Sequence, residues 1–214
     1  GRPSFGAWLS YGLGRETDEL PTFCVMTSRD KEASCGQIFY EWYWGNGFLP
    51  SHHQGVKFRG SGDPVLYLSN PSGVDQTLRR GLLDDLAKLN RLRAREVGDP
   101  EIQTRIAQYE MAYRMQASVP ELTNLASEPK HILDMYGPDV TRRGSFAHNC
   151  LLARRLVEKG GRFIELTCPS VGHDRWDQHQ NLHKGHTDNA MAVDQPIGAL
   201  LTDLKRLGLF DETL

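Results

Sequence analysis

The stretch from Ser145 to Cys168 reads SFAHNCLLARRLVEKGGRFIELTC, and its pattern changes halfway along. Ser145 is a favourable N-cap residue, and the apolar positions after it recur with the 3.6-residue period of an α-helix. The pair Gly160-Gly161 is typical of a helix end. The residues from Phe163 to Cys168 are mostly apolar and fit one short strand. We therefore expect a helix followed directly by a strand.

A polar loop and a second helical pattern follow this strand. The apolar positions of that helix recur from Val193 to Leu207, and Gly208 marks its end. A helix, a strand, a loop and a further helix are the parts of an α/β unit with right-handed crossovers. The chain stops at Leu214, where a polar turn would lead into another strand, and it starts at Gly1. We expect residues 1–214 to be part of a single domain, truncated at both ends.

Upstream of this unit, the periodicity predicts two long helices that form a hairpin. The first runs from about Gln76 to Gly98 and carries one leucine stripe, made of Leu78, Leu82, Leu86, Leu89 and Leu92. Asp99-Pro100 supplies an N-cap and a first-turn proline for the second helix. Residues 121–126 and 130–136 are predicted to be short helical connectors. Apolar runs at 23–26 and 65–68, bounded by prolines, predict short strands joined by loops.

Composition limits the class of protein. The 214 residues are 39% hydrophobic and 24% charged, which suits a globular domain with its own core. The net charge is -2 and the basic residues are dispersed, so we expect no nucleic-acid partner. No apolar run reaches the roughly 18 to 20 residues of a membrane span. The four cysteines contain no C-x-x-C pair, and either a Cys24–Cys35 bridge or free thiols would fit.

The loop after the strand is the most chemically loaded segment. Residues 172–186 read GHDRWDQHQNLHKGH and hold four of the eight histidines with two carboxylates. In an extended segment, residues two apart point the same way, so Asp177, His179 and Asn181 would converge on one point. Aspartate with histidine suits zinc, manganese or iron better than calcium. We predict a divalent-metal site, most simply zinc, although a solvated polar loop would also account for the histidines.

Other residues are secondary candidates for a site. His186 is a further candidate metal ligand, whereas His183 is expected at the surface. His173 and Arg175 would either bind a substrate anion or shape the turn. The pair His52-His53 would line a pocket or, more commonly for paired loop histidines, be solvated. The aromatic trio at 42–44 would either stack on a sugar or bury its loop against the core.

The chain resembles a bacterial sulfatase-like family catalogued as domain of unknown function 1501, within the alkaline-phosphatase superfamily. The resemblance covers nearly the whole chain. The segments that carry it are GRPSFGAW (1–8), YGLG (11–14), GFLP (47–50), QGVKFR (54–59), GDPVLY (62–67), RIAQYEMA (105–112), CLLARRLV (150–157), WDQH (176–179) and LLTDLK (200–205).

This resemblance implies a three-layer α/β/α sandwich of alkaline-phosphatase type, present as an incomplete fragment. Members of the superfamily hydrolyse phosphate or sulfate esters, or move phosphate, at a site with one or two divalent metals. The family's W-D-x-H motif falls on Trp176, Asp177 and His179, and the resemblance implies that the last two are metal ligands. The nucleophile region of the family is not in this chain. Family members are typically exported, which implies a periplasmic or extracellular location.

Three functions are compatible with these residues. The first is an exported, metal-dependent hydrolase of phosphate or sulfate esters, acting on a small-molecule or polysaccharide ester. The second is a non-catalytic exported binding or scaffold protein that keeps the fold. The third is an intracellular phosphomutase-like enzyme of the same superfamily.

Overall fold

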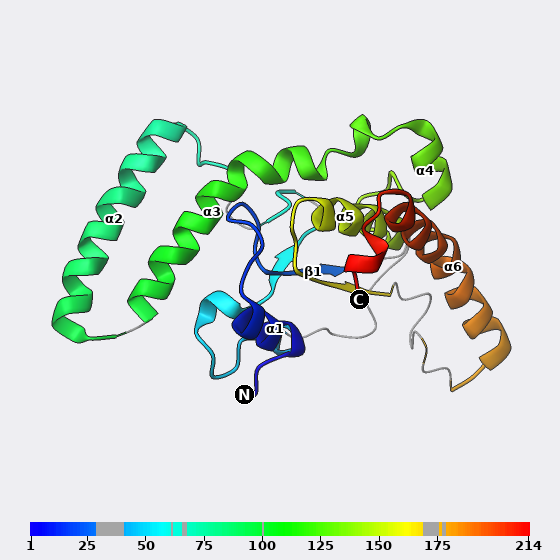
Figure 1. Ribbon diagram of the computed structural model, residues 1–214, viewed down its shortest axis with the longest axis horizontal. Helices are drawn as coiled ribbons and strands as arrows, with labels where there is room; N and C mark the ends of the chain where they lie inside the picture. Colours follow the sequence, from blue (N-terminus) through cyan, green and yellow to red (C-terminus); the bar gives the residue numbers. More distant parts are fainter. Residues whose placement is uncertain (29–40, 61, 66–67, 100, 169–175, 177–178) are drawn as a thin grey trace.

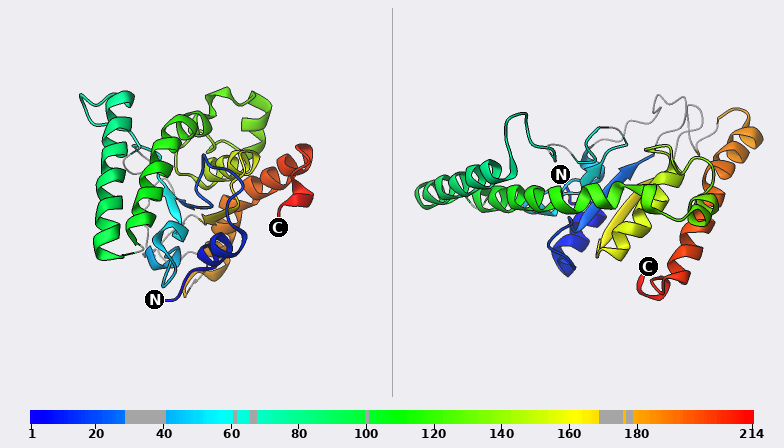
Figure 2. Two further views of the ribbon diagram at one scale, coloured as in Figure 1. Left: turned by 60° about the vertical axis from the view of Figure 1, so that its left-hand side comes forward. Right: turned by 90° about the horizontal axis from the view of Figure 1, so that it is seen from above.

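The computed structural model describes residues 1–28, 41–60, 62–65, 68–99, 101–168, 176 and 179–214. Its centre is a parallel sheet of three strands in the order β2-β1-β3, formed by Val56–Phe58, Phe23–Thr27 and Phe163–Thr167. The central strand β1 pairs Cys24 with Val56 on one side and with Ile164 on the other. Because all three strands are parallel, their carboxyl ends share one edge of the sheet (Figures 1 and 2).

Both faces of the sheet are covered, which agrees with the predicted α/β class. Alternate residues of β1 point to opposite faces. Cys24 and Met26 pack with the second half of α3 (Glu101–Thr123) and with α5 (Phe146–Glu158). Phe23 and Val25 pack with Trp44, on the side of α1 (Phe5–Leu13). The sheet therefore lies between two layers, and Cys24 is a free thiol whose pKa burial raises to about 12.

The helix and the strand predicted between Ser145 and Cys168 both form. The Ser145 hydroxyl accepts a hydrogen bond from the His148 amide at 3.0 Å, which caps α5, and β3 follows after the Gly160-Gly161 turn. The last long helix, α6 (Leu182–Arg206), packs on α5 and on α4 (Lys130–Tyr136) rather than on the sheet (Figure 1).

A buried ion-pair network joins α4, α5 and α6. Asp203 of α6 is fully buried and lies 2.9 Å from the Arg154 Nε and 2.7 Å from an Arg206 Nη. The Tyr136 hydroxyl donates to Asp203 at 3.3 Å, and Arg154 also pairs with Glu128 at 2.7 Å. Each buried charge thus has an opposite charge beside it, as burial in a low-dielectric interior requires.

The helical hairpin forms, but its leucine stripe does not face the partner helix. Helix α2 (Gln76–Val97) ends at Gly98, which has a left-handed φ of 70°, and it packs against α3 beside the main body of the molecule (Figure 1). The two buried residues of α2 are Leu83 and Ala87. All five residues of the predicted stripe are exposed, by 43 to 63%. Periodicity identified the helix correctly and its buried face wrongly.

Two further local predictions were wrong. Helix α3 continues through Pro120 to Thr123, so residues 121–126 are not a separate helix, and a 3-10 turn follows at Leu125–Ser127. Val65 lies in a bend and Leu68 outside any strand; residues 66–67 lie outside the described chain. The second outer strand is instead β2, nine residues upstream of Val65. None of the helices in the described chain is long and apolar enough to cross a membrane.

Candidate functional site

Three of the predicted site residues lie outside the described residues. They are His173 and Arg175, predicted to contact substrate, and Asp177, predicted to bind a metal. In the sequence, they lie between the carboxyl end of β3, at Thr167, and the start of α6, at Leu182. Their chain position therefore agrees with the edge at which open α/β sheets bind ligands.

The structure places the other three predicted ligands at the start of α6. His179 and Asn181 are exposed just before the helix, and His186 lies on its second turn. Asn181 has a left-handed φ of 52°, the one positive φ among the described non-glycine residues. Its side chain makes no capping hydrogen bond to the helix.

Trp176 links this segment to the sheet. Its indole nitrogen donates to the sulfur of Cys168, the residue after β3, at 3.2 Å. Its ring stacks on the imidazole of His186, with the centroids 5.9 Å apart and the planes at 27°. His186 is therefore held near the end of β3. Within the described ranges, no three histidine, cysteine or acidic residues lie together as a metal site would need.

The end of the central strand carries a buried polar cluster, Ser28, Thr167 and Asn149. The Ser28 amide donates to the Thr167 hydroxyl at 3.1 Å, and the Asn149 amide donates to the Ser28 hydroxyl at 2.9 Å. All three residues are less than 9% exposed. This cluster fixes the orientation of the Ser28 hydroxyl at the carboxyl edge.

His148 lies beside this cluster as a neutral imidazole. Its Nδ1 donates to the Val140 carbonyl at 3.0 Å, which leaves Nε2 as the acceptor. Burial lowers the pKa of His148, the Val140 bond opposes this in part, and the positive charge of Arg143 lowers it further. The lowered pKa favours the neutral imidazole, in which Nδ1 carries the proton and Nε2 carries the lone pair.

Two arginines stand over the same edge. Arg59, directly after β2, and Arg143, before α5, line a cavity of about 10 Å³ together with His148 and Asn149. This volume is about that of one water molecule. Unpaired amides at the start of a helix also carry partial positive charge, and α5 starts here. The carboxyl edge thus combines cationic side chains with buried polar donors.

Backbone contact fixes the geometry of these arginines. A Cβ on Gly60 would lie 2.7 Å from the Gly144 Cα, and a Cβ on Gly144 would lie 3.1 Å from the Gly60 Cα. Gly144 also has a φ of 79°, which other residues rarely adopt. The two glycines let the segment after β2 touch the segment before α5.

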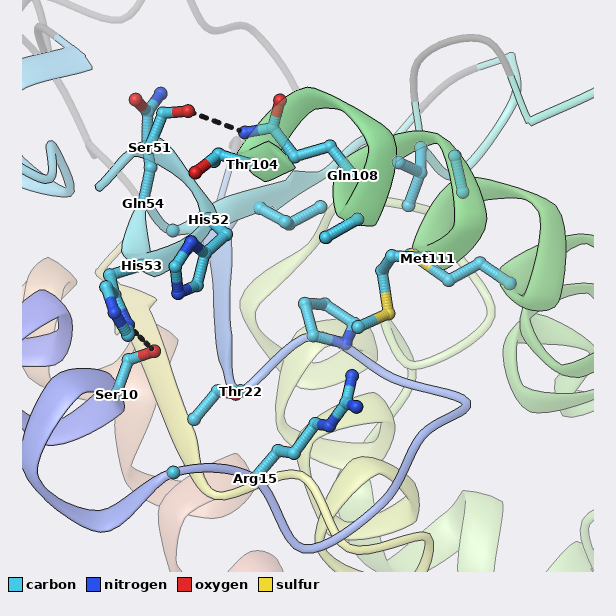
Figure 3. A pocket seen from close by; sticks show the side chains of 18 of the residues that line it. Ser10, Arg15, Thr22, Ser51, His52, His53, Gln54, Thr104, Gln108 and Met111 are labelled. Atoms are coloured by element: carbon cyan, nitrogen blue, oxygen red, sulfur yellow. Dashed lines mark hydrogen bonds between the residues drawn. The ribbon is translucent and has the colours of Figure 1, made fainter. Parts of the chain in front are cut away.

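A second cavity lies at the opposite, amino edge of the sheet (Figure 3). It measures about 720 Å³, and His52 and His53 line it. The solvated reading that the sequence favoured for this pair was therefore incomplete, because both rings face a cavity. Of the aromatic trio at 42–44, Trp44 is buried, whereas Trp42 and Tyr43 are exposed.

Sequence reasoning missed Ser28, Asn149, Arg59 and Arg143. Asn149 is 121 residues from Ser28, so no local motif contains both. One signal was available: polar residues in the first turn of a helix and directly after a strand meet at the same edge of a parallel sheet.

Comparisons with known proteins give one match. Neither the curated proteins nor the solved structures contain a significant relative of this chain. A family model described as a protein of unknown function, DUF1501, matches residues 1–214. The chain therefore belongs to the DUF1501 family.

Proposed function

We propose that this chain forms part of a metal-dependent hydrolase of phosphate or sulfate esters, exported from the cell, with its site at the carboxyl edge of the sheet. One observation carries the proposal. The positive side chains Arg59 and Arg143 and the start of α5 gather around buried polar donors at that edge. A tetrahedral oxyanion is the ligand that guanidinium groups and helix amides bind best.

The chemistry assigned to each residue follows from its place. Arg59 and Arg143 would bind the non-bridging oxygens of the ester and offset the charge that builds up on them. Asp177 and His179 would hold a divalent metal, probed first as zinc, with Asn181 and His186 as further ligands. A metal bound there would polarise the ester oxygen and activate the attacking hydroxyl or water. His148 is neutral and its Nε2 can accept a proton.

The test compares metal content and hydrolysis in the full-length protein. We expect Asp177→Ala/His179→Ala to lose bound metal and the hydrolysis of aryl phosphate or aryl sulfate. His183→Ala is the matched control, because His183 is an exposed histidine of the same segment. It should keep both. A double variant with full metal content would show that the metal assignment is wrong.

A second variant pair tests the anion-binding role. Arg59→Met and Arg143→Met keep much of the side-chain length and remove the charge. We expect each to raise KM for the ester about tenfold, because a charge-assisted hydrogen bond contributes about 1.5 to 3 kcal/mol. Metal content should not change. An unaltered KM in both variants would show that the anionic group of the ester does not bind at this edge.

A non-catalytic binding or scaffold role is the competing proposal. The exposed rings of Trp42 and Tyr43 favour it, since aromatic faces at a surface suit sugar stacking. This role predicts saturable polysaccharide binding that Trp42→Ala abolishes, together with the absence of turnover in the metal-loaded protein.

A further inference from the structure

The amino-edge cavity has the size of a small-molecule site. Its volume of about 720 Å³ lies within the roughly 300 to 1,000 Å³ of typical ligand pockets. It is bounded by the end of α1, the residues before β1, the 3-10 turn Ser51–His53 and the first half of α3. These segments are far apart in the chain, and Figure 3 shows their side chains directed into one space.

The ionisable side chains that line the cavity are all basic. Arg15 and the two histidines line the cavity, and none of the described lining residues is acidic. Arg15 pairs with Asp18 at 2.7 Å, but both side chains are about half exposed, so solvent screens this pair. The guanidinium therefore remains able to bind an anion that enters the cavity.

The two imidazoles form a fixed polar wall. The His53 Nδ1 lies 2.9 Å from the buried Ser10 hydroxyl, and the two histidine rings are 3.9 Å apart. The edge of Tyr11 contacts His53, with centroids 5.5 Å apart. Ser51, in the same 3-10 turn, ties this wall to α3: its hydroxyl donates to Glu101 at 2.9 Å and accepts from Gln108 at 3.2 Å.

The remaining lining is mainly apolar. Met111 and Met115 of α3 lie on one side, and Pro21 and Val56 come from the segments at the sheet. Methionine side chains adapt their shape and pack well on aromatic rings. The cavity thus combines an adaptable apolar surface with one guanidinium and two imidazoles.

We propose that this cavity binds a small organic anion with a ring-sized apolar body. The anionic group lies at Arg15 beside the imidazoles, and the body packs on Met111 and Met115. The site is separate from the proposed hydrolase site, because it is formed at the opposite edge of the sheet and uses none of the predicted metal ligands.

Two fluorescent probes with the same type of body test this proposal. Anilinonaphthalene sulfonate carries an anionic group, and N-phenylnaphthylamine does not. We expect Arg15→Met to weaken the sulfonate probe about five- to tenfold and to leave the neutral probe within about twofold. Ala107→Trp, which places an indole in the cavity, should abolish the binding of both probes.

The control variant is Leu82→Asp/Leu89→Asp, which removes apolar surface on α2 away from the cavity. It should bind both probes like the wild type. Equal loss of both probes in Arg15→Met, or binding that survives Ala107→Trp in a protein with unchanged melting, would overturn the proposal. Metal content is measured in parallel, and no outcome of the probe experiment depends on it.

The pH dependence gives an independent readout. Burial lowers the pKa of both His52 and His53. At His52 the Glu101 carboxylate raises the pKa in part and the Arg15 guanidinium lowers it, and at His53 a positive charge on His52 lowers the pKa further. Protonation adds positive charge, so the sulfonate probe should bind more tightly as the pH falls below the ordinary histidine pKa of about 6.5. The neutral probe should show no such increase; a flat profile for both would contradict the role of the imidazoles.

Discussion

The two edges of the sheet differ in how their polar groups are held. At the carboxyl edge, Ser28, Thr167 and Asn149 are buried and hydrogen-bonded to one another, and the cavity there admits about one water. At the amino edge, His52 and His53 border a cavity of about 720 Å³ and remain partly exposed. The polar groups of the carboxyl edge are held by one another, whereas those of the amino edge border an open cavity, for which we propose a ligand.

The course of α3 explains the difference. Its second half packs Met115, Val119 and Leu122 against the sheet core. Its first half leaves the sheet to pair with α2, and Figure 1 shows the two helices side by side. Space therefore opens between α3 and the amino ends of β1 and β2, while the carboxyl edge stays closely packed.

The largest expected effect is at the glycine contact of the carboxyl edge. Gly60→Ala places a methyl group 2.7 Å from the Gly144 backbone, which cannot yield like a side chain. We expect the free energy of unfolding to fall by about 2 to 3 kcal/mol. Gly12→Ala is the amino-edge control, because nothing lies within 4 Å of its added Cβ in α1. It should raise stability by about 0.5 kcal/mol. Urea denaturation measures both, and equal effects would contradict the contrast in packing.

The polar cluster gives the next largest effect. Asn149→Ala removes the donor to the buried Ser28 hydroxyl, and we expect a loss of about 1 to 3 kcal/mol. Ser10→Ala removes the corresponding partner of His53 at the amino edge. Water can replace it at the partly exposed imidazole, so the loss should stay below about 1 kcal/mol. If Ser10→Ala costs as much as Asn149→Ala, the amino edge is as preorganised as the carboxyl edge.

A smaller effect concerns pH. Burial lowers the pKa of His148 in the folded protein, so the unfolded chain binds its proton more readily. Stability from this group is complete above the ordinary histidine pKa of about 6.5 and falls as the pH drops below it. His148→Gln should flatten the decline in melting temperature between pH 7 and pH 5. If the melting temperature of the variant falls as steeply as that of the wild type, groups other than His148 cause the fall.

The smallest effect is expected away from both edges, on α2. Leu82→Glu and Leu89→Glu change side chains that are 50% and 63% exposed. We expect the free energy of unfolding to change by less than about 0.5 kcal/mol. Leu83→Ala, one position away but buried, should cost about 2 kcal/mol or more by the same denaturation measurement. A large cost for Leu82→Glu would show that the leucine stripe is covered.

The sequence predicted the elements whose signals are local. Ser145 and Gly160-Gly161 bracket α5, and the apolar run after them is β3, because caps and periodicity act within a few residues. The buried face of α2 was not predictable in this way. Periodicity shows that one face is apolar, but the small side chain of Ala87, with Leu83, is what lets α3 approach. Pro120 misled in the opposite sense, since it lies three residues before the end of α3 and the helix accommodates it.

The candidate site was predictable only in part. The loop after β3 was singled out because histidines and carboxylates are dense there, and its metal site stays a prediction, since Asp177, His173 and Arg175 lie outside the described residues. Ser28 and Asn149 meet only because α5 packs on the sheet. The amino-edge cavity depends on where α3 leaves the sheet, and no short motif records that.

The α2–α3 hairpin has a consequence for local opening. Helix α2 takes its support mainly from α3, through Leu83, Ala87 and the ion pair between Arg80 and Glu110 at 2.5 Å. Its detachment therefore breaks one helix–helix contact and leaves the sheet intact. Backbone amides of α2 should exchange with deuterium far sooner than those of β1, and trypsin should cut first near Arg91, Arg93 and Arg95. The molecule is thus expected to unfold in two steps, first helix α2 and then the sheet with the helices that pack on it.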